Sequence, residues 1–365
     1  MNNSIKSALC AATLFCTPSI ASAQEDHNPH HNHHTGHENH RSTAPLGVMG
    51  DHTHNKGEWM TAYSFQHMVM DGNRQGTKSI SSETIATTIS NPNGPPATFR
   101  VVPTEMTMDM HMFSAMYGVT DKLTLMGMAM YMNNSMDHIT FAGGAGTTQL
   151  GTFTTRSKGW GDISLTGIYN AYQNDKTNIN IGLGISAPTG SITETDDVLA
   201  PTGATPTLRL PYAMQLGSGT WDARPSITYT GTHDKWSWGA QYEGTIRLES
   251  KNSEGYRLGN HHNLAAWGGY QLCDEWSINA NISAEKLGRI KGADANITAP
   301  VQTADPNNYG GEMIEIGAGF TYSPDIAPIK GLELGVDLST PAYQDLNGVQ
   351  LERDWSIAAG ISYRF

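Results

Sequence analysis

Residues 105–132 read EMTMDMHMFSAMYGVTDKLTLMGMAMYM, and nine of these 28 residues are methionine. Most of the methionines recur at every second position, which is the period of a β-strand, where successive side chains point to opposite faces. The turn-like sequence GVTD separates two such runs. The stretch therefore predicts two adjacent antiparallel strands, and it leaves open whether the methionines are metal ligands or apolar filler.

The composition of the whole chain limits the class of protein. The chain has 365 residues, of which 38% are hydrophobic and 15% charged, and its mean hydropathy is −0.40. A soluble core of this size would be richer in Leu, Ile and Val. No apolar run reaches the roughly 18 residues that a membrane helix needs. If the chain crosses a membrane, we expect it to do so with strands.

The first 23 residues have the pattern of a signal peptide: a positive Lys6, an apolar stretch and a small-residue cleavage site at 21–23. The mature chain is therefore expected outside the cytoplasm. Two of the three cysteines lie inside the signal, which leaves Cys273 and no internal disulfide. Removal of Lys6 leaves 21 basic residues against 34 acidic ones, which argues against nucleic acid as a partner.

Residues 24–57 begin with a histidine-rich run and contain little that is apolar, so we expect them to be disordered. Neutral imidazole is a common ligand of zinc, copper and nickel, and a flexible chain can wrap several around one ion. The alternative is a solubilising tail that binds metal incidentally. The candidate metal ligands in this segment are His27, His30, His31, His33, His34, His37 and His40.

From residue 58 to residue 365 the chain alternates between predicted strands and polar connections. The predicted strands are 58–71, 103–117, 122–139, 157–173, 177–188, 219–231, 236–250, 260–273, 276–292, 310–323, 331–343 and 353–365. Short turns alternate with long loops, and both ends of the region fall on the short-turn side. An even number of strands with loops sorted in this way is the plan of an all-β transmembrane barrel in the outer membrane of a Gram-negative bacterium.

The two faces of the predicted strands agree with this plan. Residues 178–185, for example, alternate apolar side chains with asparagine and glycine. A charged side chain facing the middle of the bilayer costs roughly 2–4 kcal/mol for Arg or Lys. We therefore expect the following charged residues to face the lumen: Asp162, Glu243, Arg247, Glu285, Glu333 and Asp337. Tryptophans near strand starts predict an aromatic girdle against the outer-membrane lipids: Trp59, Trp160, Trp221, Trp236, Trp276 and Trp355.

The chain ends on an alternating strand, DWSIAAGISYRF, whose last residue is Phe365. This ending is similar to the C-terminal signal by which the outer-membrane assembly machinery recognises its clients. We therefore expect that machinery to be a partner of the chain during biogenesis.

Three segments carry a resemblance to a known family: GWGDISLTGIYNAY at 159–172, ISAPTGS at 185–191 and QLGSGTWDARPSITYTG at 215–231. They resemble the outer-membrane transporter-like barrels of the MetA pathway of phenol degradation. The resemblance implies a barrel that passes small solutes, hydrophobic or aromatic compounds included, and it assigns no individual functional residue. The methionine-rich strands and the histidine-rich tail depart from the ordinary pattern of that family.

The methionines can be assigned to faces strand by strand. In 103–117 they alternate with Asp109 and His111, which would be unsolvated in lipid. This predicts that Met106, Met108, Met110 and Met112 face the lipid. The methionines of 122–139 share a face with Lys122, and those of 58–71 share a face with Glu58, so both sets are predicted to face the lumen.

One lumenal wall would then carry Met60, Met68, Met70, Asp109, His111, Met126, Met128, Met130 and Met132. Thioether sulfur is soft and selects Cu(I) or Ag(I), so this wall is a candidate path for copper ions. With the tail, it resembles by composition the Met- and His-rich outer-membrane proteins of copper resistance. The alternative is flexible apolar filler that suits a hydrophobic solute.

Other functions are less well supported. Twelve-stranded outer-membrane phospholipases use a Ser activated by a His two residues away. The only His-x-Ser of this chain is His40-Arg41-Ser42, in the segment expected to be disordered. The sequence thus favours a channel for small solutes over soft-metal handling, and both over a structural barrel or a lipase.

Overall fold

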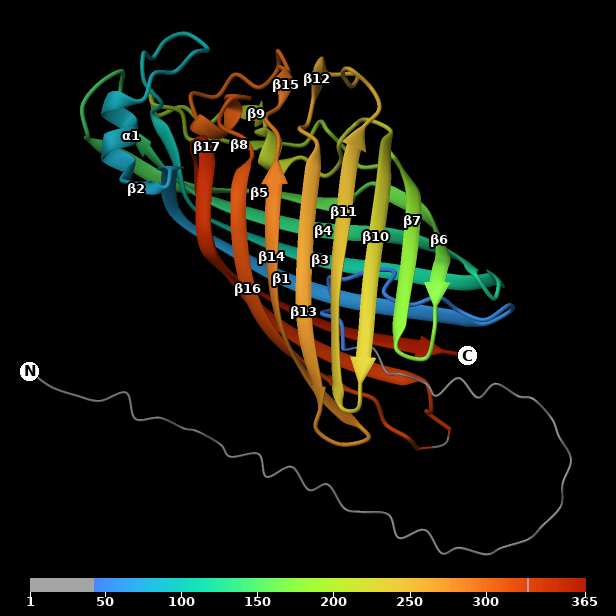
Figure 1. The fold of residues 1–365 in the computed structure, drawn as a ribbon. Coiled ribbons are helices and arrows are strands. Elements are labelled where there is room, and N and C mark those ends of the chain that lie inside the picture. Colours follow the sequence, from blue (N-terminus) through green and yellow to red (C-terminus); the bar gives the residue numbers. More distant parts are fainter. Residues whose placement is uncertain (1–42, 327) are drawn as a thin grey trace, which may run out of the picture. The chain divides into compact units, whose positions relative to one another are not determined.

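The computed structural model describes residues 43–326 and 328–365, and most of these residues form one antiparallel sheet closed into a barrel (Figure 1). The long strands are β1 (Trp59–Gly76), β3 (Val101–Thr120), β4 (Leu123–Phe141), β5 (Gln149–Trp160), β6 (Ile163–Gln173), β7 (Thr177–Ala187), β10 (Asp222–His233), β11 (Trp236–Arg247), β13 (His261–Gln271), β14 (Trp276–Leu287), β16 (Gly311–Tyr322) and β17 (Leu332–Arg364). The short elements are β2 (Lys78–Ile80), α1 (Ser82–Thr88), β8 (Thr195–Asp197), β9 (Thr207–Arg209), η1 (Tyr212–Met214), β12 (Tyr256–Arg257), β15 (Lys291–Gly292) and η2 (Gln302–Ala304). Within the described ranges, no helix is long and apolar enough to cross a membrane.

The ring of strands runs β1-β3-β4-β6-β7-β10-β11-β13-β14-β16-β17 and closes where β17 pairs with β1. β17 crosses the wall twice, because β16 pairs with its residues 334–346 and β1 with its residues 346–364. The ring thus contains eleven labelled strands, and because β17 folds back on itself and contributes two staves, twelve strand segments form the wall. The predicted antiparallel barrel of about twelve strands is confirmed.

The two ends of the barrel region meet at the closing seam. The backbone N–H of Trp59 donates to the carbonyl oxygen of Phe365, and the N–H of Phe365 donates to that of Trp59, both at 2.9 Å. The terminal phenylalanine thus lies beside the first residue of the first strand. This pairing leaves neither edge of the sheet open at the short-turn end.

The outer face of the barrel is apolar, as predicted. Ile181, Leu183 and Ile185 are all exposed on β7 and would contact lipid in a membrane. Aromatic pairs mark the short-turn end of this face: Trp59 with Tyr117, Trp236 with Tyr270 and Trp276 with Tyr322, with ring centroids 4.6–4.7 Å apart. Such a girdle is typical of the membrane–water interface.

The charged side chains predicted to face the lumen have polar partners there. Glu243 pairs with Arg224, and Arg247 pairs with Asp222. Arg353 lies 3.5 Å from Glu285, and the hydroxyl of Ser323 donates to Glu333 at 3.3 Å. Burial of these charges is tolerated because each has a partner in the barrel interior.

The predicted strand 157–173 is wrong in one respect: it is two strands. β5 pairs with residues 131–141 of β4. β6 pairs with residues 123–128 of the same strand. Gly161 and Asp162 lie between them, and β5 and β6 diverge at this point (Figure 1). Most of β5 also falls in a region predicted to be a loop, because several of its outward residues, such as Arg156 and Lys158, are polar.

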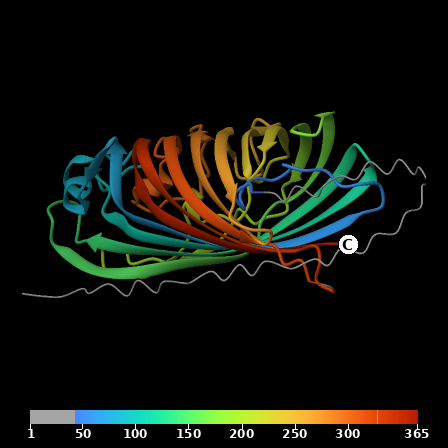
Figure 2. The same cartoon turned by 60° about the horizontal axis from the view of Figure 1, so that its bottom comes forward.

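The connections at the other end are longer and partly structured. The predicted loop 72–102 contains the end of β1, β2 and the short helix α1, whose N-cap Ser81 accepts a hydrogen bond from the N–H of Thr84. The predicted loop 189–218 contains β8, β9 and η1. These connections gather at the end of the barrel opposite the C-terminus (Figures 1 and 2).

Residues 43–57, expected to be disordered, contact the inner side of the barrel wall. The N–H of Leu46 donates to Asp337 at 2.5 Å, and Gln241 donates to the carbonyl of Met49 at 2.6 Å. The N–H of His54 donates to the hydroxyl of Thr124 at 2.8 Å. Polar lumenal side chains thus satisfy the backbone of this segment, which needs no core of its own. Residues 24–42 lie outside the described part of the chain.

Candidate functional site: a methionine wall inside the barrel

The strand pairing corrects the faces assigned to the methionines. Met112 lies directly opposite Met130, and Met110 lies opposite Met132, across the β3–β4 pair. Residues directly opposite each other in an antiparallel pair project from the same face of the sheet. The prediction that one set faces lipid and the other faces the lumen is therefore wrong.

Burial shows that this shared face is the lumenal one. Met106 is 1% exposed and packs with Leu210 and Met214, which belong to the connection between β7 and β10. Phe113, on the opposite face of β3, is 44% exposed. The methionines of β1, β3 and β4 thus all face inward: Met60, Met68, Met70, Met106, Met108, Met110, Met112, Met116, Met126, Met128, Met130, Met132 and Met136.

Asp109 and His111, predicted to face the lumen, lie instead on the outer face. Asp109 is hydrogen-bonded to His67 at 2.6 Å, and Nδ1 of His111 to the hydroxyl of Tyr63 at 2.8 Å. His67 also lies beside the exposed Trp355, with ring centroids 5.4 Å apart. These groups are tolerated on the outer face because they satisfy one another's hydrogen-bonding capacity, His67 with Asp109 and Tyr63 with His111.

The methionine wall is covered at both ends and more open in the middle. At the loop end Met106 and Met136 are buried under Met214. At the short-turn end Met116 and Met126 are buried, with Met49 packed against them. Between these covers Met68 and Met132 are buried, whereas Met108, Met110, Met112, Met128 and Met130 are only half-buried. Five thioether side chains thus remain partly accessible at the inner surface of the wall.

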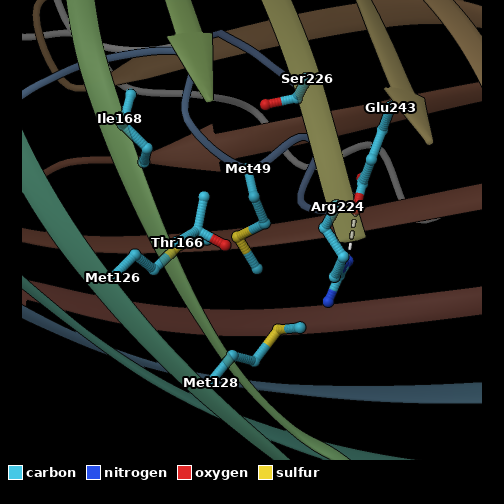
Figure 3. A pocket seen from close by; sticks show the side chains of 8 residues that line it. All are labelled: Met49, Met126, Met128, Thr166, Ile168, Arg224, Ser226 and Glu243. Carbon is cyan, nitrogen blue, oxygen red and sulfur yellow. Dashed lines mark hydrogen bonds and ion pairs between the residues drawn. The ribbon is translucent and has the colours of Figure 1, made fainter. Parts of the chain in front are cut away.

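The polar side chains Arg224 and Ser226 of β10 and Glu243 of β11 face the methionine wall, and they are called the polar wall here. An interior cavity lies where the two walls meet, and Figure 3 shows its lining side chains. These are Met49, Met126, Met128, Thr166, Ile168, Arg224, Ser226 and Glu243. Arg224 and Glu243 form an ion pair on the polar side of this cavity. The cavity therefore has thioethers on one side and an ion pair of no net charge on the other.

The barrel wall is interrupted beside β5. Within the described residues, β5 pairs with a barrel strand on one edge only, because β7 pairs with β6 and β10. Residues 188–221 cover the other edge. The N–H of Arg156 donates to Asp196 at 2.7 Å, and a Cβ added to Gly159 would lie 3.0 Å from a methyl carbon of Leu216. A connecting segment, rather than a strand, therefore closes this part of the wall.

Asp162 holds that segment in place. One carboxylate oxygen of Asp162 accepts from the N–H of Gly190 at 2.9 Å. The other accepts from the N–H and the hydroxyl of Ser218, at 2.9 and 2.8 Å. Residues 190 and 218 stand at the two ends of the covering segment. One side chain at the β5–β6 break thus fixes both ends of the cover.

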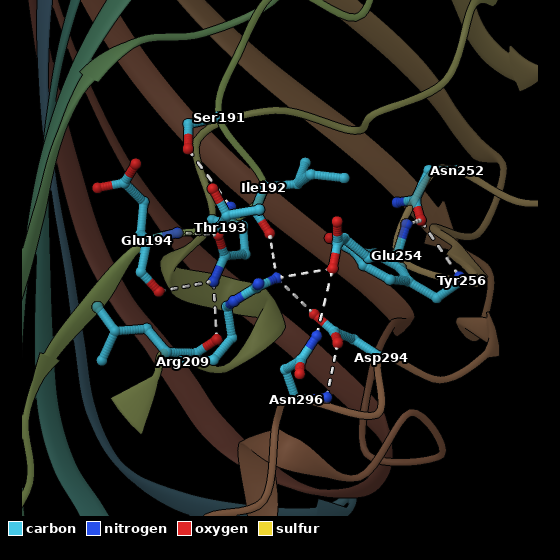
Figure 4. A network of polar contacts seen from close by, with 12 residues as sticks. Ser191, Ile192, Thr193, Glu194, Arg209, Asn252, Glu254, Tyr256, Asp294 and Asn296 are labelled. Atoms are coloured by element: carbon cyan, nitrogen blue, oxygen red, sulfur yellow. Dashed lines mark hydrogen bonds and ion pairs between the residues drawn. The ribbon is translucent and has the colours of Figure 1, made fainter. Parts of the chain in front are cut away.

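A polar network ties the same segment to its neighbours at the loop end of the barrel (Figure 4). Arg209 lies 3.1 Å from Glu254 and 2.8 Å from Asp294. A second arginine, Arg100, is fully buried among the loop-end connections. Its guanidinium donates to the carbonyl oxygens of Ala86, Ala142, Gly143, Ala145 and Gly146. Sequence reasoning missed both arginines, since their partners are distant carbonyls and carboxylates.

The structure offers few groups for the metal sites predicted from the sequence. In the part of the chain that the structure describes, no three His, Cys, Asp or Glu side chains come together to hold a metal ion. The seven tail histidines, His27 to His40, lie outside that part, as does the signal peptide. Metal binding by the tail stays a prediction, and thioether sulfur is the remaining candidate ligand in the described part of the barrel.

A family model described as "Putative MetA-pathway of phenol degradation" matches residues 90–365. The chain belongs to this family. An outer membrane channel from Pseudomonas putida F1 has the same fold, with a TM-score of 0.56 at 14% identity over 89% of this chain and 100% of that one. No curated protein matches the sequence.

Two further solved structures are more distant. A FadL homologue from Pseudomonas aeruginosa has a TM-score of 0.45 at 11% identity and covers 84% of this chain and 90% of its own. The toluene transporter TodX from Pseudomonas putida has a TM-score of 0.40 at 10% identity, with 84% and 89% covered. With its apolar outer face and aromatic girdle, this MetA-pathway family member is a barrel of the Gram-negative outer membrane.

Proposed function

We propose that the barrel passes small hydrophobic solutes, aromatic compounds among them, across the outer membrane. The observation that carries this proposal is the half-buried methionine wall between two covers. Unbranched thioether side chains adapt to apolar solutes of varied shape, which suits a path of low selectivity. The family description, which refers to phenol degradation, supports an aromatic solute.

The interrupted wall supplies a route that avoids the covered ends. A hydrophobic solute gains free energy when it leaves water for the bilayer interior. If residues 188–221 move away from β5, the solute passes from the lumen sideways into lipid. At the β5 edge the cover is held by the side chain of Asp162, by the backbone N–H of Arg156 and by packing of Leu216, and these contacts can open without disturbing strand pairing.

The proposal makes the protein a passive conduit rather than an enzyme or a purely structural barrel. Its substrate partners are neutral apolar molecules and its surroundings are outer-membrane lipids. The pairing of Phe365 with Trp59 supports a role for the terminal strand in barrel closure, and hence for the assembly machinery as a partner during biogenesis.

The test is initial uptake of radiolabelled toluene at low external concentration, in cells with and without the protein. Uptake should be faster in cells that contain the barrel. Uptake of arabinose, a polar solute of similar size, should be the same in both strains. Equal toluene uptake in both strains would rule out this function.

A further inference from the structure

Each end of the methionine wall is closed by a row of three methionines and a fourth from a cover. At the loop end Met70, Met106 and Met136 lie side by side on β1, β3 and β4, and Met214 of η1 packs onto them. At the short-turn end the row is Met60, Met116 and Met126, and Met49 packs onto it. Each cluster thus contains four methionines of this kind, beside Leu210 and Leu351 at the loop end and Ile168 at the short-turn end, although the fourth methionines come from unrelated segments.

The methionines of β1, β3 and β4 lie on the lumenal face only. Between residues 60–70, 106–116 and 124–136, every lumenal apolar side chain larger than alanine is methionine. The outer face of the same ranges has Phe65, Phe113 and Leu125, and no methionine. Leucine and methionine are close in size and polarity, so burial alone does not sort them in this way. The sorting calls for a property that methionine has and leucine lacks, and the thioether sulfur is one such property.

We propose that each four-methionine cluster binds one soft monovalent ion, Cu(I) or Ag(I). Thioether ligands favour such ions over zinc, magnesium or calcium. The rows place three thioethers on adjacent strands, where opposed Cβ atoms are about 5 Å apart, and the cover adds the fourth. Figure 3 shows Met49 and Met126 reaching into the same cavity at the short-turn end.

A buried histidine accompanies each cluster. His138 is 3% exposed, lies on the lumenal face two residues after Met136, and within the described residues its Nδ1 has no hydrogen-bond partner. His54 is 1% exposed, and its Nε2 is equally unpartnered among the residues described. The backbone of His54 is hydrogen-bonded to Thr124, two residues before Met126. An unpartnered buried imidazole nitrogen is a further ligand for a soft ion.

The ions would bridge each cover to the wall. Met214 is part of the cover at the loop end, and Met49 is part of the segment 43–57. This inference is independent of solute passage, because it concerns the closed ends of the wall rather than its open middle. Its test is therefore a binding measurement on the purified protein.

The test counts tightly held Ag(I) ions per mature chain in detergent, by metal analysis after gel filtration. Three triple Met→Leu variants are compared with the wild type: the loop-end row (Met70, Met106, Met136), the short-turn row (Met60, Met116, Met126) and a mid-wall control (Met110, Met112, Met130). Each row variant should lose one ion and the control none. Ions held by the histidine tail are common to all four proteins and cancel. Equal counts in all four proteins, or the same loss in the control, would overturn the proposal.

Two single substitutions test the same proposal without changing a barrel strand, so that a misfolded triple variant does not decide the result. Met49→Leu and Met214→Leu lie on the covers and leave the strands unchanged, so each should still close a barrel that migrates as a folded band without heating. Each should lose or weaken one Ag(I) ion. X-ray absorption at the silver edge should show a sulfur shell in the wild type. A shell of nitrogen and oxygen alone would contradict thioether binding.

Discussion

Met112 and Met130 lie directly opposite each other on β3 and β4, and both face the lumen. Their neighbours one residue along each strand, Phe113 and Ala129, form the next opposed pair on the lipid face. This alternation decides the chemistry of the lumen, because a shift of one residue would exchange the two faces completely.

The face assignment predicts how labels at neighbouring positions respond to lipid. A fluorophore on Cys at position 113 should be quenched by nitroxide-labelled lipid, since Phe113 faces the bilayer. A fluorophore at position 112 should be quenched instead by a water-soluble reagent or remain unquenched. Both substitutions are made in a Cys273→Ser background. Strong lipid quenching at position 112 would restore the faces expected from sequence.

Much of the fold could be predicted from the sequence because each transmembrane strand shows its period locally. The alternation in 178–185 and the charged lumenal residues needed no knowledge of neighbouring strands. The faces of 103–117 did need it, since Asp109 and His111 were judged without their partners His67 and Tyr63. Pairing between strands, not the pattern within one, decided the question.

The parts that escaped sequence reasoning depend on distant contacts. Residues 43–57 show no regular period, and they are held by hydrogen bonds to Asp337, Gln241 and Thr124 and by packing of Met49, all against residues far along the chain. Met214 reaches the methionine wall from a connecting segment. Such contacts leave no repeating pattern in the sequence around the residues that make them.

Asp162 is predicted to control the lateral opening. Asp162→Ala removes the acceptor for both Gly190 and Ser218, so residues 188–221 should move more freely. The initial rate of toluene uptake should rise. Asp175→Ala, in the exposed short turn between β6 and β7, is the matched control and should not change the rate. An unchanged or lower rate in Asp162→Ala would contradict the lateral route.

Arg100 is predicted to stabilise the connection of residues 142–148 between β4 and β5. Its guanidinium donates to five carbonyl oxygens, whereas lysine has three donors from a single nitrogen. Each buried carbonyl left without a donor costs roughly 1–3 kcal/mol. In Arg100→Lys, residues 142–148 should therefore be cleaved faster by added protease on intact cells. Lys251→Arg, at an exposed position, serves as the control, and equal cleavage of wild type and Arg100→Lys would refute this role.

His54 is predicted to make the docking of residues 43–57 sensitive to pH. Burial, as the largest cause, lowers the pKa of His54 to about 4 from 6.5. Between these values the undocked or unfolded chain binds a proton that the docked chain does not, so stability falls as the pH drops from 6.5 to 4. His54→Leu should remove this loss.

The measurement is the free energy of unfolding in detergent, from denaturant titrations at pH 5 and pH 8. The change in the free energy of unfolding caused by His54→Leu should be more favourable at pH 5 than at pH 8, by about 2 kcal/mol for a pKa shift of this size. His233→Leu, in an exposed turn, should show no such difference. A gain that is the same at both pH values would mean that protonation of His54 is not the cause.

The most direct test of the lumenal path is toluene uptake by cells that contain matched variants at Met110 and Met130. Replacement of both by Leu keeps the path apolar, and uptake should equal that of the wild type. Replacement of both by Asp places two charges in the half-buried middle of the wall, and uptake should fall to that of cells without the barrel. All three proteins must reach the outer membrane in equal amounts and migrate as folded barrels. Wild-type uptake by the Asp variant would contradict passage along the methionine wall.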